Sequence, residues 1–223
     1  MTITALVAGI AFAVIGAGAE RLASVWPPDE ASRRAPGVRT VLLALSAGLV
    51  AAAIAWRSTL PTWALAVQLL ILAILVLLTA TDLEQRRLPH LLLDPLIVVT
   101  VLFVPFNPSV AWADALIGAA VAIAFMGLLG LIVRGGVAVG DLYLVGPIGL
   151  VLGWPAIFVA IFVAGLLSAL FSALLLATRR AGLKTYIPFG PFLVAGMVVT
   201  LLRDAVLLGP IAAAINSAGL PLK

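Results

Sequence analysis

The order of apolar and polar residues along the chain predicts eight helices. Apolar runs alternate with short polar segments over all 223 residues, and several runs reach the roughly 20 residues that cross a bilayer as a helix. The predicted helices cover residues 3–19, 40–56, 60–81, 91–106, 112–133, 141–153, 156–177 and 189–208. The sixth contains Pro147 and covers about half a span, so it is a short or tilted crossing, or a re-entrant segment shielded by protein. The pattern predicts an all-α, polytopic transmembrane bundle formed by a single domain, residues 1–223.

The composition supports this membrane assignment. The chain is 64% hydrophobic and 10% charged, whereas soluble domains carry roughly 25% charged residues. Its mean hydropathy is +1.28. The first apolar run does not resemble a signal peptide, because its basic residues follow it, beginning with Arg21, although the small residues 16–19 resemble a cleavage site. We therefore expect this helix to be retained.

The composition also excludes several kinds of site. The chain has no cysteine, which rules out disulfides, thiolate zinc sites and cysteine nucleophiles, and its single histidine rules out a histidine-rich metal site. The net charge of +4 does not indicate nucleic-acid binding, because basic residues in so apolar a chain mark cytoplasmic loops. The five tryptophans fall near predicted span ends, as interfacial anchors do.

The distribution of basic residues predicts the orientation. Three of the thirteen fall on the even-numbered side: Arg57, Arg203 and Lys223. The other ten fall in odd-numbered connections: Arg21, Arg33, Arg34, Arg39, Arg86, Arg87, Arg134, Arg179, Arg180 and Lys184. By the positive-inside rule the odd-numbered connections are cytoplasmic and both chain ends lie outside. The sixth segment must then cross, because otherwise the last three of these ten would lie on the wrong side.

Two of the nine acids stand out by their position. Three others belong to the first polar connection: Glu20, Asp29 and Glu30. Asp114 is interpreted as opening or capping the fifth helix. Asp82 ends the third predicted helix and Asp141 begins the sixth, so both lie at the cytoplasmic ends of apolar helices. A carboxylate near hydrocarbon is costly, by about 3 kcal/mol at a helix centre, which makes both candidates for function.

Two such carboxylates brought together suit peptide-bond hydrolysis. Neighbouring carboxylates cannot both ionise cheaply, so one keeps its proton, and the pair supplies an acid and a base. The charged partner can deprotonate a water while the neutral one polarises a peptide carbonyl. The alternative is structural: Asp82 and Arg86 have the spacing of an i,i+4 ion pair, and Asp141 can cap the sixth helix.

Three motifs resemble the type IV prepilin peptidase family, membrane aspartic proteases with a Gly-x-Gly-Asp signature. The segment DLEQRRLPHLLLDPL resembles the family's first motif, with His90 in place of Asp or Asn. Its matching residues are Asp82, Glu84, Leu88, Pro89, Pro95 and Leu96. GVAVGDLYLVGPIGLVLGW places Gly140 and Asp141 on the second motif, and IPFGPFLVAG, residues 187–196, resembles a third. The motifs occur in the family's order over about residues 75–196.

The resemblance implies a function and a set of site residues. It implies an endopeptidase of the bacterial inner (plasma) membrane that cleaves the basic leader of type IV pilin-like precursors at the cytoplasmic face, just after a glycine. Asp82 and Asp141 would be catalytic. Supporting residues would be Gly140, Glu84, Pro89, Tyr143, Pro188, Gly190 and Pro191. We expect no metal or cofactor and no nucleic-acid partner, only the precursor and the bilayer, with the oligomeric state left open. His90 is interpreted as a polar helix start or a proton carrier.

The chain departs from the family pattern at several places. Ala138 replaces the first signature glycine, and Tyr143 replaces a usual lysine, which bears on rate and pH optimum more than on reaction class. In the divergent residues 1–60, IGAGAERLASVWPP lacks the asparagine of bifunctional members, and the chain has none of the cysteines of their zinc loop. We therefore expect no zinc and do not favour methyl transfer, and we interpret Glu20 and Arg21 as loop charges rather than as remnants of the methyltransferase site.

Two alternatives come from other functional classes. A proton- or cation-coupled transporter would use membrane carboxylates near the midplane and an inverted repeat, and no repeat is visible in the sequence. A non-catalytic scaffold related to the peptidases would explain Ala138 and Tyr143, and would keep the two aspartates too far apart to share a water.

Overall fold

The computed structural model describes residues 2–26, 32–132, 138–179, 182 and 187–217, with side chains described for residues 3–203 of these ranges. Within them the chain forms helices and no strand, which confirms the all-α prediction. The α-helices are α1 (Thr2–Val25), α2 (Val38–Arg57), α3 (Thr62–Gln85), α4 (His90–Phe103), α5 (Trp112–Ile132), α6 (Val139–Leu152), α7 (Ala156–Ala177) and α8 (Gly190–Ser217). A short 3₁₀ helix, η2 (Val104–Phe106), continues α4. The predicted short sixth helix is present.

Three helices end four or more residues beyond the sequence prediction. Helix α1 continues to Val25 because its last turns are packed rather than solvated: Ser24 is buried and donates to the Arg21 carbonyl at 2.8 Å. Helix α3 continues to Gln85 and ends where Arg86 adopts a left-handed conformation with φ 56°. Helix α8 runs to Ser217, since the Ala- and Leu-rich tail continues the helix. The side chains of Asp29, Glu30 and Asp204 lie outside the described residues.

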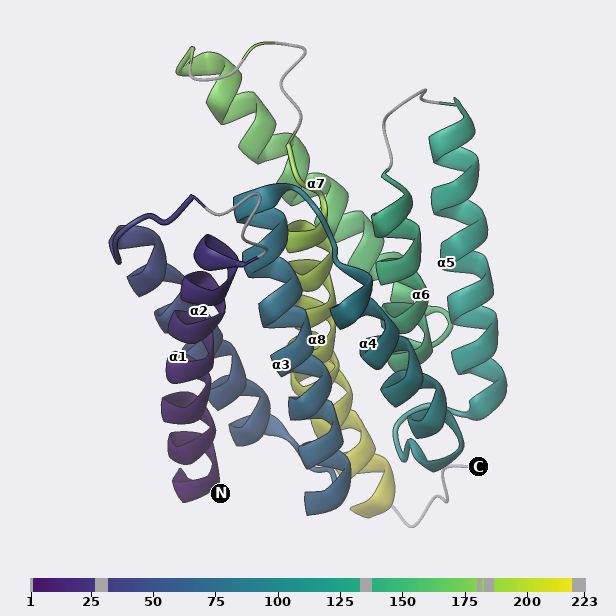
Figure 1. Cartoon of the computed structure of the whole chain (residues 1–223). Coiled ribbons are helices and arrows are strands. Elements are labelled where there is room, and N and C mark those ends of the chain that lie inside the picture. The colour runs from purple at the N-terminus through teal and green to yellow at the C-terminus, as the bar shows by residue number, and fades with distance from the viewer. Residues whose placement is uncertain (1, 27–31, 133–137, 180–181, 183–186, 218–223) are drawn as a thin grey trace.

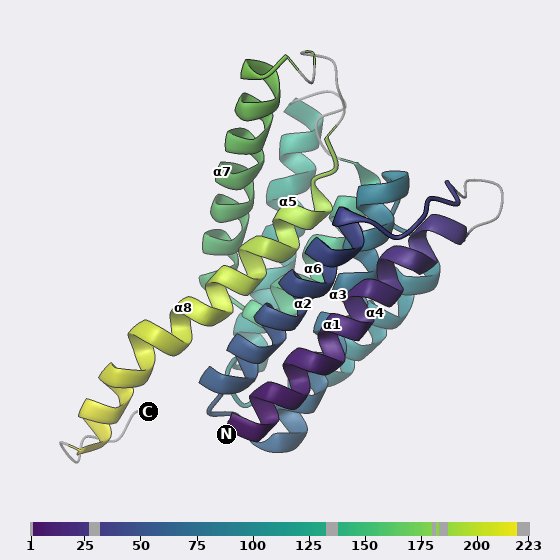
Figure 2. The ribbon, with the colours of Figure 1, turned by 90° about the vertical axis from the view of Figure 1, so that its left-hand side faces the viewer.

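Helix α3 links the parts of the bundle. It contacts α1, α2, α4 and α8, while α1 packs along α2, α5 along α6 and α7 along α8. Figure 1 shows α1 and α2 on one side of α3, and α4, α5 and α6 on the other. Figure 2 shows the C-terminal part of α8 extending beyond the other helices. One apolar core lies between α3, α4, α5, α6, α7 and α8, and a second joins α1 and α2 to α3.

Close backbone packing fixes the position of α6. A methyl group added at Gly149 of α6 would lie 2.7 Å from the Ala119 Cα atom of α5, and one added at Gly118 would lie 2.7 Å from the Gly153 carbonyl carbon. Small residues of this kind let membrane helices approach closely. In lipid the hydrophobic effect does not hold helices together, so the van der Waals contacts of this close approach stabilise the pair. The first turn of α6, which carries Asp141, therefore belongs to a helix whose position is fixed by close packing against α5.

Five of the described helices are long and apolar enough to cross a bilayer: Ile3–Val25, Val38–Arg57, Thr62–Gln85, Trp112–Ile132 and Ala156–Ala177. The shorter apolar helices are His90–Phe106, Val139–Leu152 and Gly190–Arg203. Their outward faces carry large apolar side chains, and Trp56, Trp63, Trp112 and Trp154 are exposed. The architecture is that of a multi-pass helical membrane protein.

Candidate active site

Asp82 and Asp141 meet at one pocket. Asp82 lies in the last turn of α3 and Asp141 in the first turn of α6, and each residue is only 3% exposed. Both line a pocket of about 450 Å³ at the ends of α1, α3, α4 and α6. No other described acid lines this pocket, so the pair is distinct within it.

Backbone amides hold both carboxylates. The Gly190 N–H donates to Asp82 Oδ2 at 3.1 Å, and the Ala138 N–H donates to Asp141 Oδ2 at 3.4 Å. Hydrogen bonds of this kind orient a carboxylate without neutralising it, since the donors are uncharged. A buried, oriented pair at one pocket is the arrangement that holds a water between an acid and a base.

The first residues of α8 pack directly against the Asp82 carboxylate. Gly190 is the first residue of α8, so its amide is one of the free N–H groups at a helix N-terminus, where negative charge is favoured. A methyl group at this position would lie 2.6 Å from Asp82 Oδ2 and 3.5 Å from the Leu144 side chain. Pro191 follows inside the first turn, where the missing N–H of proline costs no hydrogen bond. The IPFGPF segment thus brings backbone directly against the carboxylate.

The structural alternatives for the two aspartates have different outcomes. Asp141 does cap its helix, because it accepts from the Ala138 amide three residues earlier. Asp82 does not form the surface pair with Arg86: it is buried, its hydrogen bond comes from Gly190, and Arg86 is exposed. Capping alone does not require Asp141 to be buried at the same pocket as a second carboxylate.

The Ala138 departure is accommodated by the backbone. Ala138 precedes α6 with φ −77° and ψ 149°, an extended conformation that any L-residue adopts readily. The next signature position, Gly140, is tighter, because an added methyl group would lie 3.2 Å from the Leu88 side chain. A side chain at position 140 would therefore require the Leu88 side chain to shift by a few tenths of an ångström, whereas the conformation at position 138 does not require a glycine.

The predicted supporting residues divide into two groups. Gly140, Pro89 and Tyr143 line the pocket together with His90. His90 is the first residue of α4, its ring packs edge-on against Tyr143 with centroids 5.2 Å apart, and its Nδ1 lies 3.3 Å from Asp94. Four predicted residues are not in the lining: Glu84, Pro188, Gly190 and Pro191, of which Gly190 contacts Asp82 directly.

Trp26 and Gln85 line the pocket, although the sequence did not point to either as a site residue. Trp26 was interpreted only as an interfacial anchor. Gln85 Nε2 donates to the Ala23 carbonyl at 2.8 Å and also to the Trp26 carbonyl, which joins the ends of α3 and α1. The spacing of Gln85 from Asp82, three residues along one helix, is the sequence signal that would have pointed to it.

The interpretation of Glu20 and Arg21 as loop charges is wrong. Both lie within α1, and Glu20 is 7% exposed. Glu20 accepts hydrogen bonds from Arg34 and from Thr40 Oγ1, the latter at 2.7 Å. Arg21 Nη1 donates to the Arg34 carbonyl. Partners from the following loop and from α2 keep these charged groups inside a helical turn.

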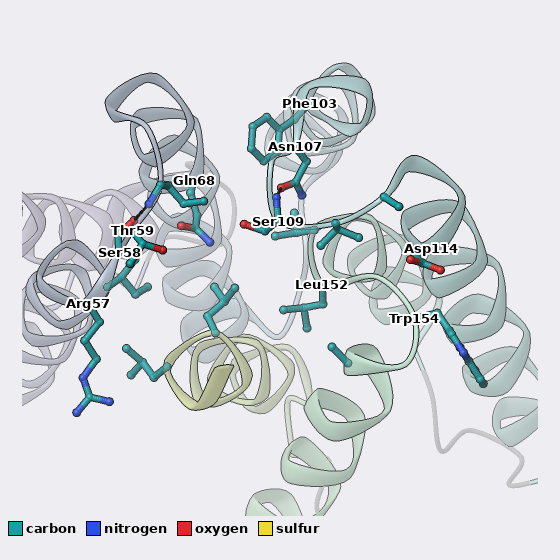
Figure 3. Close-up of a pocket in the computed structure, with 18 residues that line it drawn as sticks. Arg57, Ser58, Thr59, Gln68, Phe103, Asn107, Ser109, Asp114, Leu152 and Trp154 are labelled. Carbon is teal, nitrogen blue, oxygen red and sulfur yellow. Dashed lines mark hydrogen bonds between the residues drawn. The ribbon is translucent and has the colours of Figure 1, made fainter. Parts of the chain in front are cut away.

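A second pocket lies away from the aspartates. It has a volume of about 490 Å³ and is lined where α2 ends, α3 and α5 begin and α6 ends. Figure 3 shows Arg57 and Asp114 on opposite sides of it, with Gln68, Asn107 and Ser109 between them. Asp114 is the one acid in this lining, so this pocket offers no carboxylate pair. The described residues also contain no cluster of three or more side chains suited to hold a metal ion.

Comparison with known proteins gives consistent matches. A model of the type IV leader peptidase family matches residues 69–173, which include both aspartates. The prepilin leader peptidase/N-methyltransferases of Aeromonas hydrophila and Aeromonas salmonicida are each 32% identical over 177 residues, covering 75% of this chain and 60% of the relative. The protein of the same name from Bacillus subtilis is 29% identical over 138 residues, covering 59% of this chain and 53% of the relative. This chain thus spans well under two thirds of the length of these relatives. No solved structure matches it.

Proposed function

We propose that this chain, which belongs to the type IV leader peptidase family, is a membrane aspartic endopeptidase that removes the leader from type IV pilin-like precursors. The observation that carries the proposal is the meeting of Asp82 and Asp141 at one pocket, each buried and each tied to a backbone amide. The names of the relatives supply the substrate class, and the paired acids supply the chemistry.

In the proposed reaction the two carboxylates share one proton and hold one water. The ionised carboxylate takes a proton from the water as its oxygen attacks the scissile carbonyl carbon, and the protonated one gives its proton to the carbonyl oxygen. The resulting tetrahedral diol collapses: the C–N bond breaks, the amide nitrogen takes a proton from one carboxyl, and a hydroxyl proton returns to the pair. Asp82 and Asp141 end in their starting protonation state.

The position of the acids favours a peptidase over a transporter. Asp82 is in the last turn of its helix and Asp141 in the first turn of its own, so both lie at helix ends. A carboxylate that carries ions across the bilayer is expected nearer the midplane. A scaffold with separated aspartates is disfavoured because both aspartates line the same pocket.

Cleavage is proposed to occur at the cytoplasmic face of the inner membrane. The support is the charge bias: Arg86 and Arg87, which line the pocket, belong to the connections that hold most of the basic residues. The precursor's apolar helix would then lie in the bilayer with its leader at the pocket. Methyl transfer, which the relatives' names include, is not proposed, because residues 1–60 depart from the segment that bifunctional members share.

The proposal is tested by processing of a pilin-like precursor with the purified full-length chain in detergent. Wild type should release the leader, while Asp82→Asn and Asp141→Asn should each lower the rate at least about 100-fold, the scale of general acid–base catalysis. Asp114→Asn is the matched control, since Asp114 lines the other pocket and is absent from the lining around the two aspartates. Equal processing by wild type and both active-site variants would refute the proposal.

A further inference from the structure

A cluster of charged residues lies beside the pocket and is not part of its lining. It consists of Glu20 of α1, Arg34 of the following connection, Arg39 and Thr40 of α2, and Glu84 of α3, and we name it the arginine clamp. Its members come from three helices and one connection. Neither the proposed chemistry nor the family comparison gives these contacts a role.

Arg34 is the centre of this cluster. Its Nη2 lies 2.5 Å from Glu20 Oε1 and 3.1 Å from Glu84 Oε2, so a single guanidinium joins α1 to α3. Arg39 Nη1 approaches the same Glu84 oxygen at 3.4 Å, and Thr40 Oγ1 donates to Glu20 Oε2. The planar guanidinium with several donors suits such a bridge, whereas a lysine ammonium is a single point charge.

The two acids of the clamp are shielded from water. The Glu20 side chain is 8% exposed and the Glu84 side chain 11%, while that of Arg34 is 36% exposed. The hydrogen bond to Glu20, helped by the charges of Glu84 and Glu20, raises the pKa of Arg34 above its ordinary value. Removal of Arg34 leaves two shielded carboxylates with reduced compensation, a strongly unfavourable state.

The clamp acts on the helical turn that carries Asp82. Glu84 follows Asp82 by two residues, and Gln85 in the same turn is bound to the end of α1 through the Ala23 and Trp26 carbonyls. Helix α3 then ends at Arg86, and the terminal turn of a helix frays unless other groups hold it. The outer side of this turn is thus held by α1 and the Arg34 bridge, and its inner side presents Asp82 to Gly190.

We infer that Arg34 is a positioning residue for the proposed reaction: it fixes the last turn of α3 against α1 and thereby sets where the Asp82 carboxylate stands relative to Asp141. The inference rests on the proposed function for its catalytic consequence. Its geometric part, that the bridge fixes the distance between the ends of α3 and α6, stands independently of any activity.

The catalytic part is tested by measuring the kinetics of precursor cleavage for each variant. The rates are normalised to the amount of folded protein, which is quantified by size-exclusion chromatography. Arg34→Gln should lower kcat about 10- to 100-fold with KM changed less than about twofold, because small displacements of a reacting group carry such costs. Arg34→Lys should recover part of the loss. Glu84→Gln combined with Arg34→Gln should lose less than the product of the two single losses, since both remove one contact. Arg57→Gln, an exposed arginine beside the other pocket, is the control.

The geometric part is tested by spin-label distances. The chain has no native cysteine, so Leu83→Cys and Val139→Cys, both at exposed positions beside the two aspartates, can be labelled selectively. We expect a narrow distance distribution that broadens or shifts in Arg34→Gln and is partly restored in Arg34→Lys. If Arg34→Gln fails to fold, Arg34→Lys still decides, because the lysine nitrogen lies closer to the backbone than Arg34 Nη2, which contacts both acids, and the weakened bridge should broaden the distribution by itself.

The outcomes separate the inference from the proposed function. An unchanged distance distribution, or an altered one with unchanged kcat, overturns the positioning role while Asp82→Asn can still abolish cleavage. A wild-type chain that cleaves no precursor overturns the proposed function, and the distance measurement then still decides whether Arg34 holds the end of α3.

Discussion

The amide of Gly190 donates a 3.1 Å hydrogen bond to the Asp82 carboxylate, across 108 residues of sequence. The same glycine leaves no room for a side chain, because a methyl group would lie 2.6 Å from the bonded oxygen. Contact and lack of space together fix the carboxylate against the first turn of α8. Gly190 therefore positions Asp82 by its backbone alone.

Gly190→Ala is expected to displace the Asp82 carboxylate and lower precursor cleavage about 100-fold, since misplacement of a reacting group by roughly 1 Å has such effects. Initial rates of leader release measure it. Gly127→Ala is the matched control, because an added methyl group there meets no atom within 4 Å. A Gly190→Ala rate within threefold of wild type would contradict this role.

Ala138→Gly is expected to leave cleavage within about twofold of wild type. The extended backbone at position 138 already suits an alanine, so restoring the family glycine relieves no strain. The glycine should slightly lower the free energy of unfolding, by about 0.4–1 kcal/mol, because it adds freedom to the unfolded chain. A large gain in rate would mean that the methyl group of Ala138 hinders the reaction.

Gly149→Val is expected to destabilise the bundle by separating α6 from α5. Its side chain would overlap the Ala119 backbone, and overpacking of this kind typically costs about 1–3 kcal/mol or more. Thermal stability in detergent, followed by size-exclusion chromatography, measures the effect. Gly165→Val of α7, where an added methyl group meets nothing within 4 Å, should melt like wild type; equal melting of both variants would exclude direct α5–α6 backbone contact.

Arg87→Cys and Arg57→Cys are expected to react with a membrane-impermeant maleimide from opposite sides of the membrane. Arg87 lines the aspartate pocket and Arg57 lines the other one, so the pair reports which pocket faces the cytoplasm. In intact cells only the cysteine at position 57 should be labelled, and permeabilised cells should label both. Labelling of both from the same side would overturn the predicted orientation.

The sequence was sufficient for the helices and for the position of Asp82 and Asp141 at helix ends. Apolar runs of bilayer length identify helices without any tertiary information, and all eight predicted helices occur. Asp82 and Asp141 were recognisable because each carboxylate borders an apolar helix and falls in a specific motif. Their common pocket depends on the path of the chain through the bundle, which no local pattern encodes.

Glu20 and Glu84 show where the sequence was insufficient. An acid followed by an arginine is typical of a solvated connection, yet Glu20 is held by Arg34 and Thr40, which are 14 and 20 residues away. Glu84 was expected at the pocket because it belongs to the motif of Asp82. Neighbouring residues of a helix face different directions, and Glu84 faces the arginine clamp instead.

The two carboxylates are fixed by different means, and this sets an order of assembly. Asp141 takes its hydrogen bond from Ala138 in its own helical turn, so it is oriented as soon as that turn forms. Asp82 takes its hydrogen bond from the Gly190 amide at the start of α8, so it is oriented only when α8 packs against α3. We therefore expect Asp141 to be oriented before Asp82 during synthesis, because a nascent chain that lacks α8 also lacks the amide that holds Asp82.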